Sequence, residues 1–198
     1  MKLPVENLIK LDNRFEKIID KFGIIKLEKK SNPFEELVKA IIYQQLSGKA
    51  ASTIYNRFLE IYKNNHPTTT ELMNTEHQKL RSVGLSNRKA EYIKSIAEFF
   101  NVNSYNLNDF SKMKNDDIFN KLINIRGVGP WTIDMFLIFT LHRLDIFPSL
   151  DLGVQKGFSI FYNSKKLYSP KSMLKEANKW RPYRSIASHY FWKIADDK

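Results

Sequence analysis

Two glycines, Gly127 and Gly129, interrupt a helical pattern and constrain the fold more than any other feature of the chain. Acidic residues in a first turn, followed by apolar residues at helical spacing, predict a short helix before them (Asp116, Asp117, Ile118 and Leu122). Pro130 then stands where a new helix takes its first residue, and helical spacing resumes (Ile133, Phe136, Leu137, Thr140 and Leu141). The sequence therefore predicts a helix, a tight glycine hairpin and a second helix.

Such a hairpin has a chemical consequence. Residues without Cβ atoms let the backbone approach a ligand, and the first amides of the following helix point outward. These donors and the helix dipole form an anion site, for which a phosphodiester is the natural occupant. A plain connection between two helices, in which the glycines only permit the turn, explains the same residues. For the Gly-Val-Gly sequence alone, both interpretations stay open.

The charge of the chain favours a polyanionic partner. Lysine and arginine exceed the acidic residues in the 198-residue chain by 32 − 21 = 11. Neutralising phosphates with such residues releases counterions, and this drives binding that does not depend on base sequence. A positive surface that serves only solubility is the alternative interpretation.

Several kinds of site are excluded by composition and spacing. The chain has no cysteine, so it has no disulfide, thiolate zinc site or iron–sulfur cluster. Its four histidines show no metal spacing, and it has neither a phosphate-binding loop nor a serine nucleophile elbow. No leader-like segment or membrane span is evident, and we expect an intracellular protein of the cytoplasm or nucleoid.

Apolar periodicity predicts helices along the chain, and no useful segment alternates apolar and polar residues, so the predicted class is all-α. One helix is expected over residues 5–27. Asn32, Pro33 and Glu35 predict the start of another, as N-cap, first residue and third residue. Residues 75–78 resemble a capping box, residues 66–70 and 101–115 are expected to be loops, and later helices are expected to start at Ser169-Pro170 and at Pro182. Arg88, Lys89 and Lys94 are expected on or near the exposed side of a helix, where they could contact phosphate; for each lysine taken singly, a solvated face is the favoured interpretation.

Three segments together resemble the helix-hairpin-helix DNA glycosylase superfamily. They are residues 41–51 (IIYQQLSGKAA), residues 125–132 (IRGVGPWT) with the later Asp151, and residues 180–185 (WRPYRS). The resemblance spans about residues 33–192 and is greatest to the 3-methyladenine DNA glycosylase II group. It implies a two-lobed, all-α fold with the active site in the cleft between the lobes. One lobe is a helical barrel over residues 33–143 with the hairpin, and the other combines residues 1–32 with 144–198.

The resemblance implies a hydrolase that removes alkylated purines, of the 3-methyladenine and 7-methylguanine type, from double-stranded DNA and so initiates base excision repair. Asp151 matches the catalytic carboxylate, which stabilises the oxocarbenium-like sugar. It also stands where a helix N-cap is expected, and it can serve both purposes. Trp131 stands where members with strand-cleaving activity carry lysine, so no lyase activity is implied.

The resemblance also implies roles in base recognition. Trp131 and Trp192 match aromatic positions of the base pocket, Gln44 lies beside it, and Met135 and Leu152 replace tyrosines of a related enzyme. For a tryptophan taken singly, without the resemblance, a core residue is the favoured interpretation. Gln45 matches the wedge that fills the gap left by a nucleotide rotated out of the duplex, although adjacent amides at a helix end can also be simple caps.

The hairpin is expected by resemblance to meet phosphate through the amides of Gly127, Gly129 and Thr132. It is also expected to hold a structural Na⁺ or K⁺ through three backbone carbonyls (Ile123, Ile125 and Val128). No cofactor is expected for the chemistry. The expected partner is double-stranded DNA with a flipped damaged base, and the protein is expected to be a monomer that does not bind membranes.

Two rival functions stay open at this stage. One is a glycosylase of the same fold that acts on deaminated or oxidised bases. The other is a non-catalytic DNA-binding module that uses the hairpin for phosphate contact alone.

Overall fold

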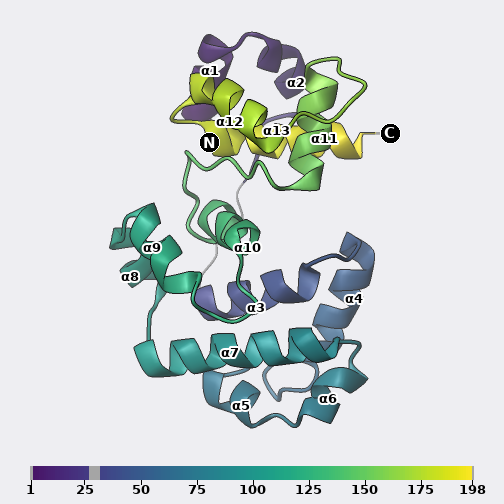
Figure 1. The fold of residues 1–198 in the computed structure, drawn as a ribbon, viewed down its shortest axis with the longest axis vertical. Helices are drawn as coiled ribbons and strands as arrows, with labels where there is room; N and C mark the ends of the chain where they lie inside the picture. Colours follow the sequence, from purple (N-terminus) through teal and green to yellow (C-terminus); the bar gives the residue numbers. More distant parts are fainter. Residues whose placement is uncertain (1, 27–31, 198) are drawn as a thin grey trace. The chain divides into compact units, whose positions relative to one another are not determined.

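The computed structural model describes residues 2–26 and 32–197, and every regular element in these ranges is a helix (Figure 1). The predicted all-α class is therefore confirmed for the described residues. None of the described helices has the length and apolar character needed to cross a membrane.

The chain forms two compact units. Unit 1 combines Met1–Lys29 with Leu137–Lys198, and unit 2 is the continuous stretch Lys30–Phe136. The hairpin thus lies in unit 2, whereas Asp151 lies in unit 1.

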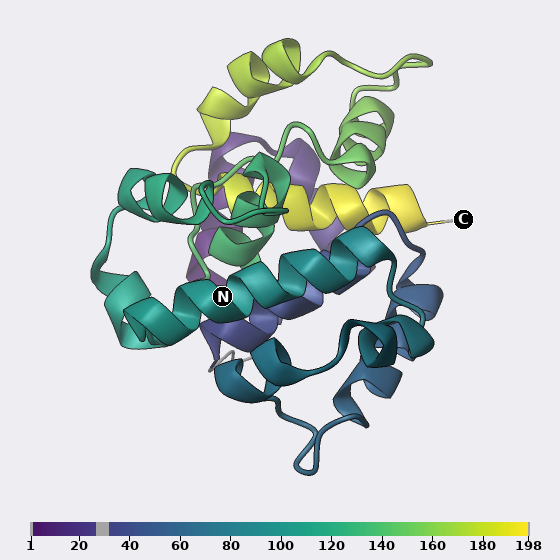
Figure 2. The ribbon, with the colours of Figure 1, turned by 60° about the horizontal axis from the view of Figure 1, so that its bottom comes forward.

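Unit 2 is built around its longest helix, α7 (Asn87–Asn103). Helix α3 (Pro33–Tyr43) runs beside it (Figures 1 and 2), and buried aliphatic side chains from both helices form the core between them (Leu37, Ile41, Ile93 and Ile96). The remaining helices of the unit are α4 (Gly48–Leu59), α5 (Thr69–Asn74), α6 (His77–Ser82), α8 (Leu107–Lys112), α9 (Asn115–Leu122) and α10 (Pro130–Met135).

The start of α3 is the one that its sequence predicts. The Asn32 side chain accepts the Phe34 and Glu35 amides at 3.1 and 3.4 Å, and Pro33 is the first helical residue. The Asn32 amide also donates to the Glu35 carboxylate at 2.7 Å. The predicted cap is therefore confirmed, because it depends only on residues within one turn of each other.

Three local predictions were wrong. Residues 5–27 contain two helices, α1 (Lys2–Leu11) and α2 (Arg14–Phe22), instead of one. The capping box is formed by Thr68 and Glu71, and its N-cap Thr68 lies within the expected loop at 66–70. The Thr75 hydroxyl donates instead to the Glu71 carbonyl at 2.7 Å, so it does not cap α6.

Helix α8 occupies part of the expected loop at 101–115, with its own capping box of Asn106 and Asp109.

Unit 1 surrounds α13 (Arg184–Asp196), which starts two residues after the predicted Pro182. Helix α11 (Leu152–Phe161) crosses it closely, and α12 (Pro170–Ala177) starts with the predicted Ser169 cap. The short helix η2 (Asn178–Trp180) follows, and its Trp180 is fully buried. An aromatic cluster fills the core of the unit (Phe15, Phe147, Phe158, Trp180 and Phe191).

The predicted helix after Pro130 changes form at its middle. Helix α10 ends at Met135 and is followed by a π-helix, η1 (Phe136–Thr140). Its last residues begin unit 1, where Phe139 is exposed.

Candidate functional site: the hairpin and the Asp151 carboxylate

The hairpin between α9 and α10 is formed by two successive turns. The Ile125 amide donates to the Leu122 carbonyl, and the Val128 amide donates to the Ile125 carbonyl, both at 3.0 Å. Gly127 takes a φ of 90°, in the left-handed region that favours glycine. Gly129 is the N-cap of α10 and Pro130 its first residue. The predicted helix, glycine hairpin and helix are therefore present.

The two glycines serve different purposes. A Cβ atom on Gly127 would lie 2.1 Å from Cγ of Tyr92, so the hairpin backbone presses against that ring. Gly129 has a φ of −109°, and a Cβ there would meet no heavy atom within 4 Å. Gly127 is thus required for packing, whereas Gly129 leaves open space beside the start of α10.

No side chain caps α10 at Gly129. Thr132, in the first turn, is 1 % exposed, and its hydroxyl accepts a hydrogen bond from the Gln44 side chain at 2.9 Å. The Thr132 side chain is therefore directed into the protein. Only its amide is available for the predicted role at phosphate.

Gln44 connects the end of α3 to the hairpin. Besides the bond to Thr132, its side-chain nitrogen makes a longer contact of 3.4 Å with the Gly127 carbonyl. The next residue, Gln45, is exposed and takes a left-handed φ of 57°, which is uncommon for a residue with a side chain. Gln45, the predicted wedge residue, is thus exposed to solvent at a bend. The hydrogen bonds of the Gln44 side chain connect this bend to the hairpin.

The hairpin carbonyls are chemically suited to a monovalent cation. Uncharged backbone oxygens are supplied by Ile123, Ile125 and Val128. The Ile125 oxygen accepts the Val128 amide with one lone pair and keeps a second lone pair. Among the described residues there is no group of three or more His, Cys, Asp or Glu side chains that could hold a metal ion. The structural Na⁺ or K⁺ at these three carbonyls stays a prediction.

In unit 1, Asp151 is the N-cap of α11, as predicted. Its Oδ1 atom accepts the Val154 amide at 2.8 Å and the indole N–H of Trp192, also at 2.8 Å. One donor comes from the helix that Asp151 caps and the other from α13. Two hydrogen bonds from separate helices fix the position of this carboxylate.

Gly153 makes this arrangement possible, although no pattern in the sequence predicted a role for it. A Cβ on Gly153 would lie 2.8 Å from Trp192 Cδ1 and 3.1 Å from Asp151 Oδ1. Only glycine therefore leaves the indole room to reach the carboxylate. The sequence does contain a glycine two residues after Asp151, at the start of a helix. This spacing indicates a role for Gly153 only when the position of Trp192 beside it is known.

Trp192 is partly buried within an aromatic group of unit 1. Its ring lies 5.2 Å from Phe139 and 5.5 Å from His189, measured between centroids. Burial, with the charges of His142 and Lys193 adding to it, lowers the pKa of His189 to about 4. This histidine is therefore neutral at physiological pH.

The other predicted base-pocket residues are distributed over both units. In unit 2, Trp131 is partly buried and Met135 is buried. In unit 1, Leu152 is 55 % exposed beside Asp151. Asp134, three residues after Trp131, was missed by the sequence analysis, and burial raises its pKa to about 7. A group that titrates near neutrality, one turn from a predicted site residue, has functional interest.

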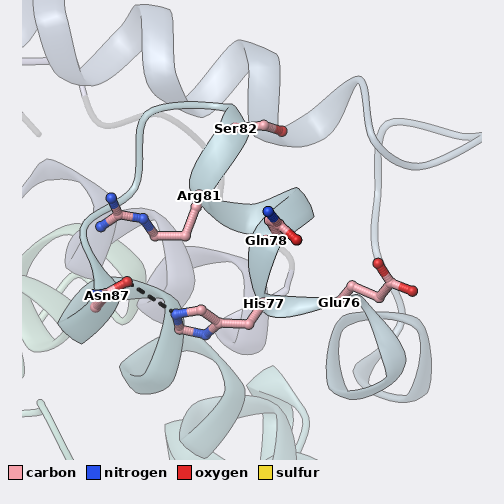
Figure 3. A pocket seen from close by; sticks show the side chains of 6 residues that line it. All are labelled: Glu76, His77, Gln78, Arg81, Ser82 and Asn87. Carbon is pink, nitrogen blue, oxygen red and sulfur yellow. Dashed lines mark hydrogen bonds between the residues drawn. The ribbon is translucent and has the colours of Figure 1, made fainter.

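A surface pocket of unit 2 contains none of these residues. It is lined by residues of α6 and the start of α7 (Glu76, His77, Gln78, Arg81, Ser82 and Asn87). Figure 3 shows the His77 ring directed at Asn87, with 3.2 Å between the bonded atoms. This bond joins the two helices, and we assign the pocket no role in the site.

The regular elements described in this chain are all helices, a glycine hairpin joins two of them, and an aspartate starts a later one. These are features of the helix-hairpin-helix class of DNA-repair proteins. The model of the HhH-GPD superfamily of base excision DNA repair proteins matches residues 38–182, and the chain belongs to this family.

Individual relatives agree with this assignment. The chain is 33 % identical to DNA-3-methyladenine glycosylase 1 of Schizosaccharomyces pombe over 184 residues, which cover 92 % of this chain and 81 % of that protein. A solved structure of the S. pombe 3-methyladenine DNA glycosylase in complex with abasic DNA has a TM-score of 0.89 and 33 % identity, and the match covers 96 % of this chain and 95 % of that one. A DNA-3-methyladenine glycosidase from Bacillus halodurans gives a TM-score of 0.84 and 32 % identity, over 98 % and 89 % of the two chains.

Proposed function

We propose that the protein is a monofunctional DNA glycosylase that hydrolyses the N-glycosidic bond of alkylated purines in double-stranded DNA and so initiates base excision repair. Similarity to proteins named DNA-3-methyladenine glycosylase supports the substrate class. The structural observation that carries the proposal is the Asp151 carboxylate, held at 2.8 Å by both Val154 and Trp192.

The carboxylate supplies what glycosidic cleavage needs. As the bond between sugar and base breaks, positive charge develops on the sugar, and a fixed anion beside it lowers the barrier. Because Val154 and Trp192 already orient Asp151, little reorganisation accompanies the reaction. The same carboxylate orients the attacking water.

The leaving base needs no strong acid. A purine alkylated on a ring nitrogen is cationic before the bond breaks, so it departs readily without further protonation. Electron-rich aromatic faces attract such a base, and we assign this role to Trp131 and Trp192, with Gln44, Met135 and Leu152 completing the recognition of the base. Because Trp131 occupies the position that carries lysine in strand-cleaving members, the product is an intact abasic strand.

The remaining proposed roles concern DNA contact. The amides of Gly127, Gly129 and Thr132 bind phosphate, and Gln45 enters the space left by the flipped nucleotide. The carbonyls of Ile123, Ile125 and Val128 hold the structural cation. Affinity for duplex should therefore be higher in K⁺ than in a bulky organic cation at equal ionic strength; equal affinities in the two would contradict the cation site.

Base release from a panel of duplexes, each with one defined lesion, tests the function. We expect release from duplexes with 3-methyladenine or 7-methylguanine, no strand cleavage, and loss of roughly 10²–10³-fold in rate in an Asp151→Asn variant. This variant would retain the helix cap, since asparagine caps about as well as aspartate. Release of deaminated or oxidised bases alone would identify the rival substrate class. Binding without any release would identify a non-catalytic module.

A further inference from the structure

Lys89 has a role that its sequence context does not reveal. It is the third residue of α7, and it was expected on a solvated face beside Arg88. In the structure its ammonium group donates to the carbonyls of Ile42 and Gln44, at 2.7 Å each. The prediction for Lys89 was therefore wrong, because a partner 45 residues away in sequence draws the side chain inward.

The two bonds satisfy carbonyls at the end of α3 that the helix itself leaves unpaired. They also place a positive charge at the negative end of the helix dipole, which stabilises this helix end. The Lys89 side chain is partly buried, so water is partly excluded from its ammonium group, and this burial lowers its pKa. Two backbone carbonyls replace that water.

The same two bonds fix the bend that presents Gln45. The Gln44 carbonyl, which Lys89 binds, belongs to the peptide bond leading into Gln45, whose φ is 57°. The Gln44 side chain is held at the same time by Thr132 at 2.9 Å. Gln44 is thus held at its carbonyl by α7 and at its amide by α10, and Gln45 follows directly.

Helix α7 reaches the hairpin as well. Tyr92, one turn after Lys89, lies against the hairpin backbone at Gly127. Glu91 forms an ion pair with Arg126 of the hairpin at 2.8 Å. One end of α7 therefore contacts both the bend at Gln45 and the turn that we assign to phosphate binding.

We propose that Lys89 is a positioning residue that sets Gln45 at a fixed distance from the hairpin. Binding of the DNA backbone by the hairpin then places Gln45 at the space left by a missing base without further ordering of the bend. The inference rests on the proposed function, because it takes Gln45 as the residue that fills that space.

Affinity for a duplex with a tetrahydrofuran abasic site, divided by affinity for the same duplex undamaged, measures this effect without catalysis. Lys89→Met should lower the ratio about tenfold, to the value of Gln45→Ala, because charge-assisted hydrogen bonds to the bend are lost. The double variant should fall no further than either single variant, since both changes remove one effect. Lys89→Arg, which keeps the charge and the donors, should restore most of the ratio.

Arg88→Met is the matched control, since it removes one exposed positive charge from the neighbouring position. It should weaken binding to both duplexes equally and leave the ratio unchanged. Three results would overturn the proposal: a Lys89→Met effect equal to that of Arg88→Met, additive effects of Lys89→Met and Gln45→Ala, or no abasic preference in the unaltered protein. If Lys89→Met fails to fold, Lys89→Gln enters the same cycle, because its amide can still reach one carbonyl.

The proposed function is tested separately. A protein that prefers abasic duplex but releases no base from the lesion panel would contradict the proposed function and leave the role of Lys89 intact. If the protein releases bases normally and Lys89→Met leaves the ratio of abasic to undamaged affinity unchanged, the proposed function stands and the role of Lys89 is contradicted.

Discussion

At the scale of single residues, the Asp151 carboxylate is useful only if it is held in place. The indole N–H of Trp192 and the amide of Val154 both donate to its Oδ1 atom. A hydrogen bond to a charged group contributes about 1.5–3 kcal/mol, so the indole bond alone is large enough to affect the rate. Trp192 thus combines two separable contributions, an aromatic face and a donor.

Trp192→Phe separates these contributions, because phenylalanine keeps an aromatic ring beside Phe139 and lacks the donor. We expect single-turnover base release to fall about tenfold, with a further loss in Trp192→Ala from the missing ring face. Trp180→Phe is the matched control, since Trp180 also donates its indole N–H to a carboxylate, that of Asp12, at 3.0 Å. It should lower the melting temperature and leave the release rate of the folded protein unchanged. An unaltered rate in Trp192→Phe would show that the indole bond does not serve the reaction.

At the scale of elements, the hairpin shows that two glycines of one motif can have different structural roles. Both glycines match the same pattern, but Gly127 lies against Tyr92 and Gly129 faces open space. No periodicity or cap rule distinguishes them, because the difference depends on a side chain of α7 far away in the chain.

Gly129→Ala should leave the stability within about 0.5 kcal/mol and weaken binding to undamaged duplex, since its new methyl group points into the space where we place phosphate. Gly127→Ala should lower the melting temperature clearly, because it combines a strained φ of 90° with the clash against Tyr92. Fluorescence anisotropy on labelled duplex and thermal melting distinguish the two effects. Full affinity in a folded Gly129→Ala protein would argue against phosphate contact at this point.

The crossing of α11 and α13 offers a second prediction at this scale. A Cβ on Gly157 would lie 1.9 Å from the Phe191 carbonyl oxygen, in the backbone of the neighbouring helix. Gly157→Ala should therefore destabilise unit 1 by at least the roughly 1–3 kcal/mol typical of overpacked cores. Gly48→Ala, at a helical glycine with open space around it, should be neutral or slightly stabilising. Equal urea midpoints for the two variants would contradict the close crossing.

These elements show how far sequence reasoning reaches. The caps by Asn32 and Asp151 were predicted correctly because each depends on residues within three positions. The capping box at Thr75 was wrong because the Thr75 hydroxyl is used by Glu71 and Tyr62. Lys89 and Gly153 escaped prediction for the same reason: their partners come from other helices. The resemblance provided the family and its expected site residues, but it did not provide the contacts that hold them.

At the scale of the whole molecule, two partly buried ionisable groups have opposite effects on stability. Asp134, in unit 2, has its pKa raised by burial from 3.8 to about 7. The folded state then binds the extra proton, and the free energy of unfolding falls as the pH rises from about 4 to 7. His189, in unit 1, has its pKa lowered from 6.5 to about 4. Here the unfolded state binds the extra proton, and the free energy of unfolding rises over about pH 4 to 6.5.

Single variants should reveal these opposing contributions. Asp134→Asn should gain stability over the unaltered protein as the pH rises from about 4 to 7, by at most about 1.4 kcal/mol per pH unit, and the gain should stay constant above about pH 7. His189→Gln should show the reverse, with its relative stability highest near pH 4 and lowest above about pH 6.5. Urea unfolding at pH 4, 5, 6, 7 and 8 measures both differences.

The division into units sharpens this test. If urea unfolds the protein in two transitions, Asp134→Asn should alter the pH dependence of one and His189→Gln that of the other, because each group lies in a different unit. If unfolding is a single transition, both variants act on that transition, and their effects should add, since the difference curves arise from independent protons. Difference curves that stay flat with pH would show that neither group has the shifted pKa that its burial implies. If only one variant changes the pH dependence of stability, the residue altered in the other variant does not have the pKa shift that its burial implies.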